Sequence, residues 1–253
     1  MSSSQGMHSP VEQFEIKSLI DLSFFGHDVS FTNSSLFMLL AVTISSLFLM
    51  VAMRHGRMVP DRMQGSAEVL YEFVAEMVKS NVGKEGRPYF PFIFTLFIFL
   101  LFGNLLGLIP YSYTFTSQII VTFAMAAFVF VGVTLIALFK HGLHFFSFFV
   151  PSGAPKILVP FLIIIEIISY FVRPVSLSVR LFANMLAGHT MLKVFAGLAV
   201  MISGAGGIAM IGSLLPFAAL IGLTGLEVLV AALQAYVFTI LTCMYLNDAL
   251  HLH

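Results

Sequence analysis

The chain has 253 residues, 59% of them hydrophobic and only 9% charged, and a mean hydropathy of +1.00. Soluble domains carry about 25% charged residues, so this composition predicts an integral membrane protein. The twelve basic and twelve acidic residues cancel, which gives no indication of nucleic acid as a partner. A single cysteine, Cys243, excludes an internal disulfide framework and a cysteine-only metal cluster.

The beginning of the chain predicts an outer-side segment followed by a first membrane span. The first thirty residues contain four acids and lack the basic stretch and apolar core of a cleavable signal peptide. Residues 34–53 are uncharged and long enough to cross a bilayer once. Arg54, Arg57 and Arg62 follow directly. Because basic residues beside a span mark the cytoplasmic or matrix face, we expect residues 1–33 on the opposite, outer side.

Residues 60–80 predict an amphipathic helix. Glu68, Glu72 and Glu76 recur at helical spacing, and the residues between them are mostly apolar. Since this segment is too charged to span a bilayer, we expect it to lie flat on the basic face of the membrane.

The next region predicts a helical hairpin. No Lys, Arg, Asp or Glu occurs between positions 88 and 139. The polar and aromatic stretch 110–117 divides this region into two apolar spans, so we expect a hairpin over residues 91–139 with its turn on the outer face. Lys140 and Lys156 bracket the following loop and return it to the basic face.

Two overlong apolar segments occupy the rest of the chain, within residues 157–247. At about 1.5 Å per residue, a helix over 157–200 would far exceed the ~30 Å hydrocarbon core. This segment is therefore either two short spans or one long, steeply tilted helix, and its two prolines do not decide between them. The glycine-rich stretch 203–207 is the expected turn before the second segment. We expect residues 34–253 to form a single membrane domain.

An arginine within the first of these segments is the leading functional candidate. Arg180 has no acidic neighbour in the sequence, and a guanidinium keeps its charge at any physiological pH. Placing it at helix-centre depth costs about 2.5–3.5 kcal/mol on insertion scales, so such a residue is a functional-site hypothesis by default. The alternatives are a structural arginine paired with Glu166 or Glu227, and an arginine that snorkels to a lipid headgroup, which its position in the middle of the segment disfavours.

Helical spacing sorts the nearby polar residues into two faces. At about 100° per residue, Asn184 and Glu166 come about 40° from Arg180, whereas His189 comes roughly opposite. Titratable groups at membrane depth can pass protons along, and a fixed cation between two such groups would block a direct leak. A packing histidine remains the alternative for His189, and an interhelical hydrogen bond remains the alternative for Asn184.

The last segment carries a second polar face. Glu227 and Gln234 are seven residues apart, so they share one side of a helix, with Ala231 between them. Glu227 comes about twenty residues into the returning segment, so it can meet an outer-side group on the first segment. A protonated carboxyl bonded to the backbone is the alternative for Glu227, and interhelical packing is the alternative for Gln234.

Three other classes of function are weaker. The chain has no HExxH, GxSxG or Walker-type motif, so hydrolytic and nucleotide-binding sites have no motif to support them, and we expect no cofactor. A secondary transporter that binds an anionic substrate at Arg180 predicts internal repeats, and none is visible. A metalloenzyme using His189 and Glu227 lacks a convincing set of metal ligands.

Residues 180–189, reading RLFANMLAGH, closely resemble subunit a of the F-type ATP synthase, and the similarity extends along nearly the whole chain. The supporting segments are SPVEQF at 9–14, NLLGLIP at 104–110, LQAYVF at 233–238 and YLNDALHLH at 245–253. The combination of His189 with Glu227 resembles the alphaproteobacterial and mitochondrial branch of this family.

This resemblance implies a stator subunit beside a rotating ring of c subunits, with b-type peripheral-stalk subunits as further partners and no catalysis of its own. The implied fold is an all-α polytopic membrane protein with about five membrane helices and one amphipathic surface helix, the last two membrane helices being long and strongly tilted. The implied location is an energy-coupling inner membrane, bacterial or mitochondrial, with the C-terminus on the cytoplasmic or matrix side.

The resemblance also implies roles for the polar residues. Arg180 would face the ring carboxylate and separate two offset half-channels that carry protons. An outer half-channel and its junction with the ring would be served by His189, Glu227, Gln234 and Asn184. Glu166 would serve the inner half-channel.

Overall fold

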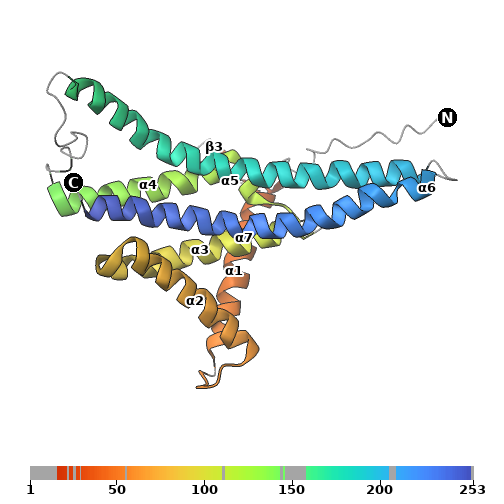
Figure 1. Ribbon diagram of the computed structural model, residues 1–253, viewed down its shortest axis with the longest axis horizontal. Helices are drawn as coiled ribbons and strands as arrows, with labels where there is room; N and C mark the ends of the chain where they lie inside the picture. The colour runs from red at the N-terminus through yellow and green to blue at the C-terminus, as the bar shows by residue number, and fades with distance from the viewer. Residues whose placement is uncertain are drawn as a thin grey trace.

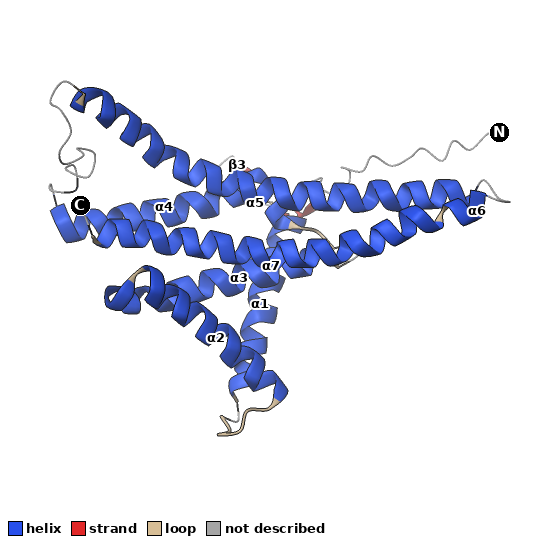
Figure 2. Ribbon diagram, viewed as in Figure 1, coloured by secondary structure: helices blue, strands red, loops and turns tan. Residues whose placement is uncertain are grey.

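The computed structural model describes residues 16–21, 23–24, 27–28, 30–54, 56–109, 112–142, 145, 158–204 and 209–251. Helices dominate this part of the chain (Figures 1 and 2). By length and composition, five described helical segments can cross a membrane: Asn33–Met53, Gly83–Gly107, Ile119–His141, Val159–Gly204 and Leu214–Leu250. The expectation of an all-α polytopic membrane protein is confirmed.

The structure gives each element its bounds. The helices are α1 (Asn33–Met53), α2 (Arg62–Asn81), the 3-10 helix η2 (Gly83–Tyr89), α3 (Phe90–Gly107), the 3-10 helix η3 (Phe115–Ser117), α4 (Ile119–His141), α5 (Val159–Gly204), α6 (Ala209–Gly212) and α7 (Leu214–Leu250). Short antiparallel strand pairs precede α1: β1 (Ser18–Ile20) with β4 (Phe31–Thr32), and β2 (Ser23–Phe24) with β3 (His27–Asp28). No pattern in the sequence predicted these strands.

The first overlong segment is one continuous helix rather than two spans. α5 has 46 residues and contains Pro174. At 1.5 Å per residue it is about 69 Å long, roughly twice the thickness of the hydrocarbon core, so it can remain within a bilayer only if it is strongly inclined. Figure 1 shows α5 changing direction along its length, and it shows α1 crossing the long axis of the α5–α7 pair at a steep angle. The expected turn at 203–207 falls mostly outside the described residues.

α7 is the central helix of the bundle. It packs against α2, α3, α4 and α5. Two small buried residues, Ala231 and Ala235, let neighbouring helices approach closely. Asn104 on α3 donates a hydrogen bond to the backbone oxygen of Ala231, at 3.1 Å. α7 is thereby tied to the α3–α4 hairpin at the same depth as its own polar residues.

Charged groups gather around η2 and the ends of α4 and α7. Lys140 forms an ion pair with Glu85 and donates a hydrogen bond to the backbone oxygen of Leu250 at 3.2 Å. Nearby, Arg173 of α5 pairs with Asp248, with 2.9 Å between Nη1 and Oδ2. These contacts place the start of the hairpin, its end and the end of α7 at one end of the bundle. Lys156, which was expected there too, lies outside the described residues.

A tight contact holds the α3–α4 connection against α3. A Cβ atom added at Gly103 would lie 2.4 Å from Cζ of Phe115. The Phe115 ring has little room to move, because it is 1% exposed and stacks on Phe99 with 5.4 Å between ring centroids.

We therefore expect Gly103→Ala to lower the free energy of unfolding by about 1–3 kcal/mol, as overpacking of a core does. Gly132→Ala is the matched control, because a Cβ atom at that helical position meets no atom within 4 Å. Denaturant titration of the purified protein in detergent measures both variants. Equal stability of the two would contradict this account of the connection.

Candidate functional site: a buried histidine–glutamate pair and an exposed arginine

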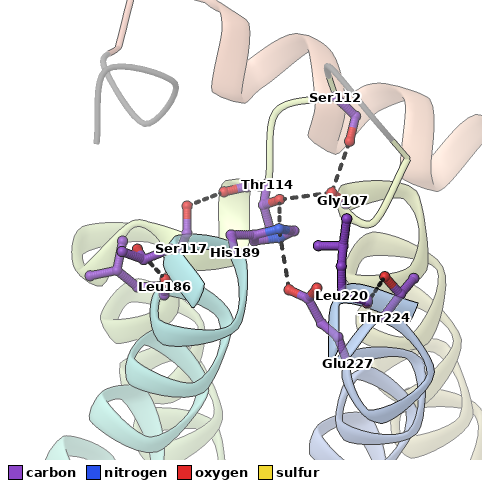
Figure 3. A network of polar contacts seen from close by, with 10 residues as sticks. Gly107, Ser112, Thr114, Ser117, Leu186, His189, Leu220, Thr224 and Glu227 are labelled. Atoms are coloured by element: carbon purple, nitrogen blue, oxygen red, sulfur yellow. Dashed lines mark hydrogen bonds and ion pairs between the residues drawn. The ribbon is translucent and has the colours of Figure 1, made fainter. Parts of the chain in front are cut away.

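His189 of α5 and Glu227 of α7 meet inside the bundle (Figure 3). Their side chains are almost fully buried, and 3.2 Å separates His189 Nδ1 from Glu227 Oε1. The two long helices run side by side, so a residue late in α5 faces one early in α7 (Figure 1). Both groups are titratable, so the pair places two groups that can carry a proton side by side in the bundle.

Gly188 allows this contact. A Cβ atom added there would lie 2.8 Å from Glu227 Oε1 and 3.2 Å from Glu227 Cδ. Any larger residue would therefore push the carboxyl group away from α5. In the sequence Gly188 stands out only as part of the family motif, because its contact with Glu227 on α7 exists only in the folded chain.

Thr114 is a third member of this cluster that the sequence analysis missed. It lies between α3 and α4, and its hydroxyl oxygen is 2.8 Å from His189 Nε2. It also lies 3.1 Å from the backbone oxygen of Gly107, to which it can donate (Figure 3). The only sequence signal was the polar character of 110–117, which was read as an outer turn. That this turn folds back onto α5 is a tertiary feature.

Arg180 lies on the other face of α5. Its side chain is exposed, whereas Leu181, Met185 and His189 are buried on the packed face. No carboxylate in the described part of the chain forms an ion pair with Arg180. Within the described residues, this excludes the alternative that Glu166 or Glu227 neutralises Arg180 inside the subunit.

The other three candidate residues are placed separately from the His189–Glu227 pair. Gln234 is 5% exposed and shares the buried face of α7 with Glu227 and Ala231, as the seven-residue spacing predicts. Asn184 and Glu166 on α5 are partly buried. No hydrogen bond among the described residues joins any of the three to the pair.

A second polar group lies toward the beginning of α5. Arg173 pairs with Asp248 and lies over two tyrosine rings, 5.6 Å from the Tyr170 centroid and 5.3 Å from the Tyr245 centroid. Glu166 is seven residues before Arg173, two helical turns closer to this end of the bundle. Nothing in the sequence pattern predicted Asp248 as a charged partner for α5.

Small residues mark the exposed face of α7. Gly222 and Gly225 are exposed, and a Cβ atom at either would meet no atom within 4 Å. Ala232 is exposed further along the helix, and Ala183 and Ala187 follow Arg180 on the exposed side of α5. Faces of this kind allow another helix to approach closely.

The described residues contain no group of three or more His, Cys, Asp or Glu side chains that could hold a metal ion. The candidate site is made of titratable and charged side chains. It consists of a buried imidazole–carboxyl pair, a hydroxyl on the imidazole, and a cation facing outward from the same helix.

Comparisons with known proteins give the family. The family model described as "ATP synthase A chain" matches residues 35–247. A protein of Rhodospirillum rubrum named ATP synthase subunit a is 56% identical over 247 residues, which cover 98% of this chain and 100% of the relative.

Two further relatives carry the same name. The protein of Parvibaculum lavamentivorans is 55% identical over 96% of this chain and 93% of its own length. The protein of Paramagnetospirillum magneticum is 53% identical over 98% of this chain and 100% of its own length. With a family match over most of its residues and relatives matched over nearly their full length, the chain belongs to the ATP synthase subunit a family, whose members are multi-pass, non-catalytic membrane components of the F-type ATP synthase.

Proposed function

We propose that this chain is the proton-translocating stator subunit of a rotary F-type ATP synthase, with Arg180 separating two offset half-channels. The observation that carries the proposal is the exposed Arg180 without a carboxylate partner among the described residues. A cation at membrane depth is costly unless it is paired. A carboxylate on a neighbouring ring of c subunits supplies the partner.

The exposed small residues support the same docking face. Gly222 and Gly225 on α7 and Ala183 on α5 leave room for helices of a ring to pass close to the long pair. A ring that turns against this face needs contacts without large interlocking side chains. The length and inclination of α5 and α7 give the face enough extent to meet more than one ring helix.

The two half-channels lie on either side of Arg180. His189 and Glu227 serve the outer one, with Gln234 and Asn184 at its junction with the ring. Glu166 serves the inner one, near the end of the bundle where Arg173 and Asp248 pair. A proton that moves from one half-channel to the other then has to be carried by the ring, because the guanidinium repels it on the direct route.

The runner-up function is a secondary transporter that uses Arg180 for an anionic substrate. The family membership favours the stator subunit, whose further partners are the c-ring, b-type peripheral-stalk subunits and other subunits of the complex. We also propose that the N-terminus lies on the outer side and the C-terminus on the cytoplasmic or matrix side.

Replacing Arg180 tests the central claim. In vesicles containing the whole complex, we expect Arg180→Gln to abolish ATP-driven acidification and to raise the passive proton leak, because the barrier between the half-channels is lost. Arg62→Gln, which removes an exposed charge from α2, is the matched control and should pump normally. Normal pumping by assembled Arg180→Gln complexes would refute the proposal.

Gly188 tests the outer half-channel. Gly188→Ala places a methyl group against Glu227, so we expect ATP-driven acidification to fall about tenfold through misplacement of the carboxyl group. Gly197→Ala on the same helix meets no atom within 4 Å and should leave pumping within about twofold of wild type. If the two variants pump alike, Glu227 does not need its observed position.

The orientation is tested by thiol labelling. Cys243 is buried, so it gives little background. We expect a cysteine at Lys17 to react with a membrane-impermeant maleimide only from the outer side, and a cysteine at Lys79 only from the inner side. Mass spectrometry of the labelled subunit, in vesicles of both orientations, measures this. The reverse pattern would overturn the proposed orientation.

A further inference from the structure

The hydroxyl group of Thr114 lies between two hydrogen-bond partners of different kinds. On one side is the backbone oxygen of Gly107 at 3.1 Å, which can only accept. On the other side is His189 Nε2 at 2.8 Å, which donates or accepts according to the tautomer of the ring. Thr114 itself is fully buried, so neither contact competes with bulk solvent.

A hydroxyl has a single hydrogen, so it donates to one of these partners at a time. When it donates to Gly107, its oxygen accepts from His189 and Nε2 carries a proton. When it donates to His189, Nε2 is bare and the proton of the ring is on Nδ1, which lies 3.2 Å from Glu227 Oε1. The direction of this one O–H bond is therefore coupled to the tautomer of the buried imidazole.

The surroundings let the hydroxyl change direction without leaving the carbonyl of Gly107 unpaired. Ser112 also donates to this oxygen, at 2.9 Å, and remains when Thr114 turns away (Figure 3). The Thr114 backbone is held in place, because the Ser117 hydroxyl donates to its backbone oxygen at 2.6 Å. The absence of a side chain at Gly107 lets the Thr114 hydroxyl lie close to the backbone of α3, since a Cβ atom added at Gly107 would lie 2.6 Å from Thr114 Oγ1.

We propose that Thr114 is a further residue of the outer half-channel, the hydroxyl through which the His189–Glu227 pair exchanges its proton with the outer side. This inference rests on the proposed function. It assigns to the turn between α3 and α4 a part in proton transfer, in addition to closing the hairpin.

The transfer balances as a relay. A hydronium ion from the outer side gives a proton to Thr114 Oγ1, while the original hydroxyl proton passes to His189 Nε2. The Nδ1–H bond breaks, and its proton forms the carboxylic acid of Glu227. The new O–H bond of Thr114 then points to Gly107, and threonine and imidazole are neutral before and after. Before the next proton enters, the imidazole must regain its first tautomer, so its Nε2–H bond must break and an Nδ1–H bond must form.

The test compares three variants in assembled complexes, in vesicles stripped of the soluble catalytic head. The measurement is the initial rate of proton uptake driven by a potassium diffusion potential. Thr114→Val keeps the shape and removes the hydroxyl, so we expect the rate to fall about tenfold. Thr114→Ser keeps the hydroxyl and should retain at least about half the rate.

Thr122→Val is the matched control. Thr122 is equally buried, and its hydroxyl donates to backbone oxygens of Gln118 and Ile119 in its own stretch of chain. We expect this variant to stay within about twofold of wild type. Rates are normalised to the amount of assembled complex, so a variant that fails to assemble does not enter the comparison. If Thr114→Val fails to assemble, the comparison of Thr114→Ser with wild type decides.

Wild-type uptake by Thr114→Val would overturn the inference, and so would equal losses in the valine and serine variants. The proposed function fails separately. Normal pumping by Arg180→Gln would remove it whatever Thr114 does. An inactive Arg180→Gln together with a fully active Thr114→Val would leave the proposed function standing and remove only Thr114 from the path.

Discussion

The close approach of α7 to α5 at Gly188 is the contact on which the candidate site depends. It allows a carboxyl group and an imidazole to meet at 3.2 Å, with both side chains almost fully buried. Polar groups at membrane depth are tolerated when protein groups satisfy them. His189 Nε2 is hydrogen-bonded to Thr114, and Nδ1 lies 3.2 Å from Glu227 Oε1. The site therefore draws on three segments that are far apart in the sequence.

α5 separates two kinds of chemistry because its faces have different neighbours. The face with His189 is packed against α7 and the α3–α4 connection, where its side chain meets Glu227 and Thr114. The face with Arg180 has no described carboxylate partner, so its charge acts outward. Arg180 and His189 are nine residues apart in the sequence, so their side chains lie on opposite faces of the same helix. A single helix in this way carries an exposed cation on one face and a buried imidazole–carboxyl pair on the other.

Much of the fold could be predicted from hydropathy and charge. The uncharged spans, the basic residues that follow the first of them and the amphipathic stretch between them correspond to α1, α2, α3 and α4. The sequence left 157–200 open, because a proline can bend a helix without ending it, and Pro174 lies inside an unbroken α5. The short strands before α1 carry no comparable signal, since pairs of two or three residues are below what residue patterns predict.

The sequence by itself determined which polar residues enter the apolar segments and on which helical faces they lie, because helical periodicity is local. Arg180 opposite His189, and Glu227 on one face with Gln234, follow from spacing alone. Only the tertiary structure decided which faces meet. The contact of His189 with Thr114, the room that Gly188 leaves for Glu227 and the pairing of Arg173 with Asp248 depend on how distant helices pack. Packing is set by the sum of many side-chain contacts across the bundle, and no single stretch of sequence contains that sum.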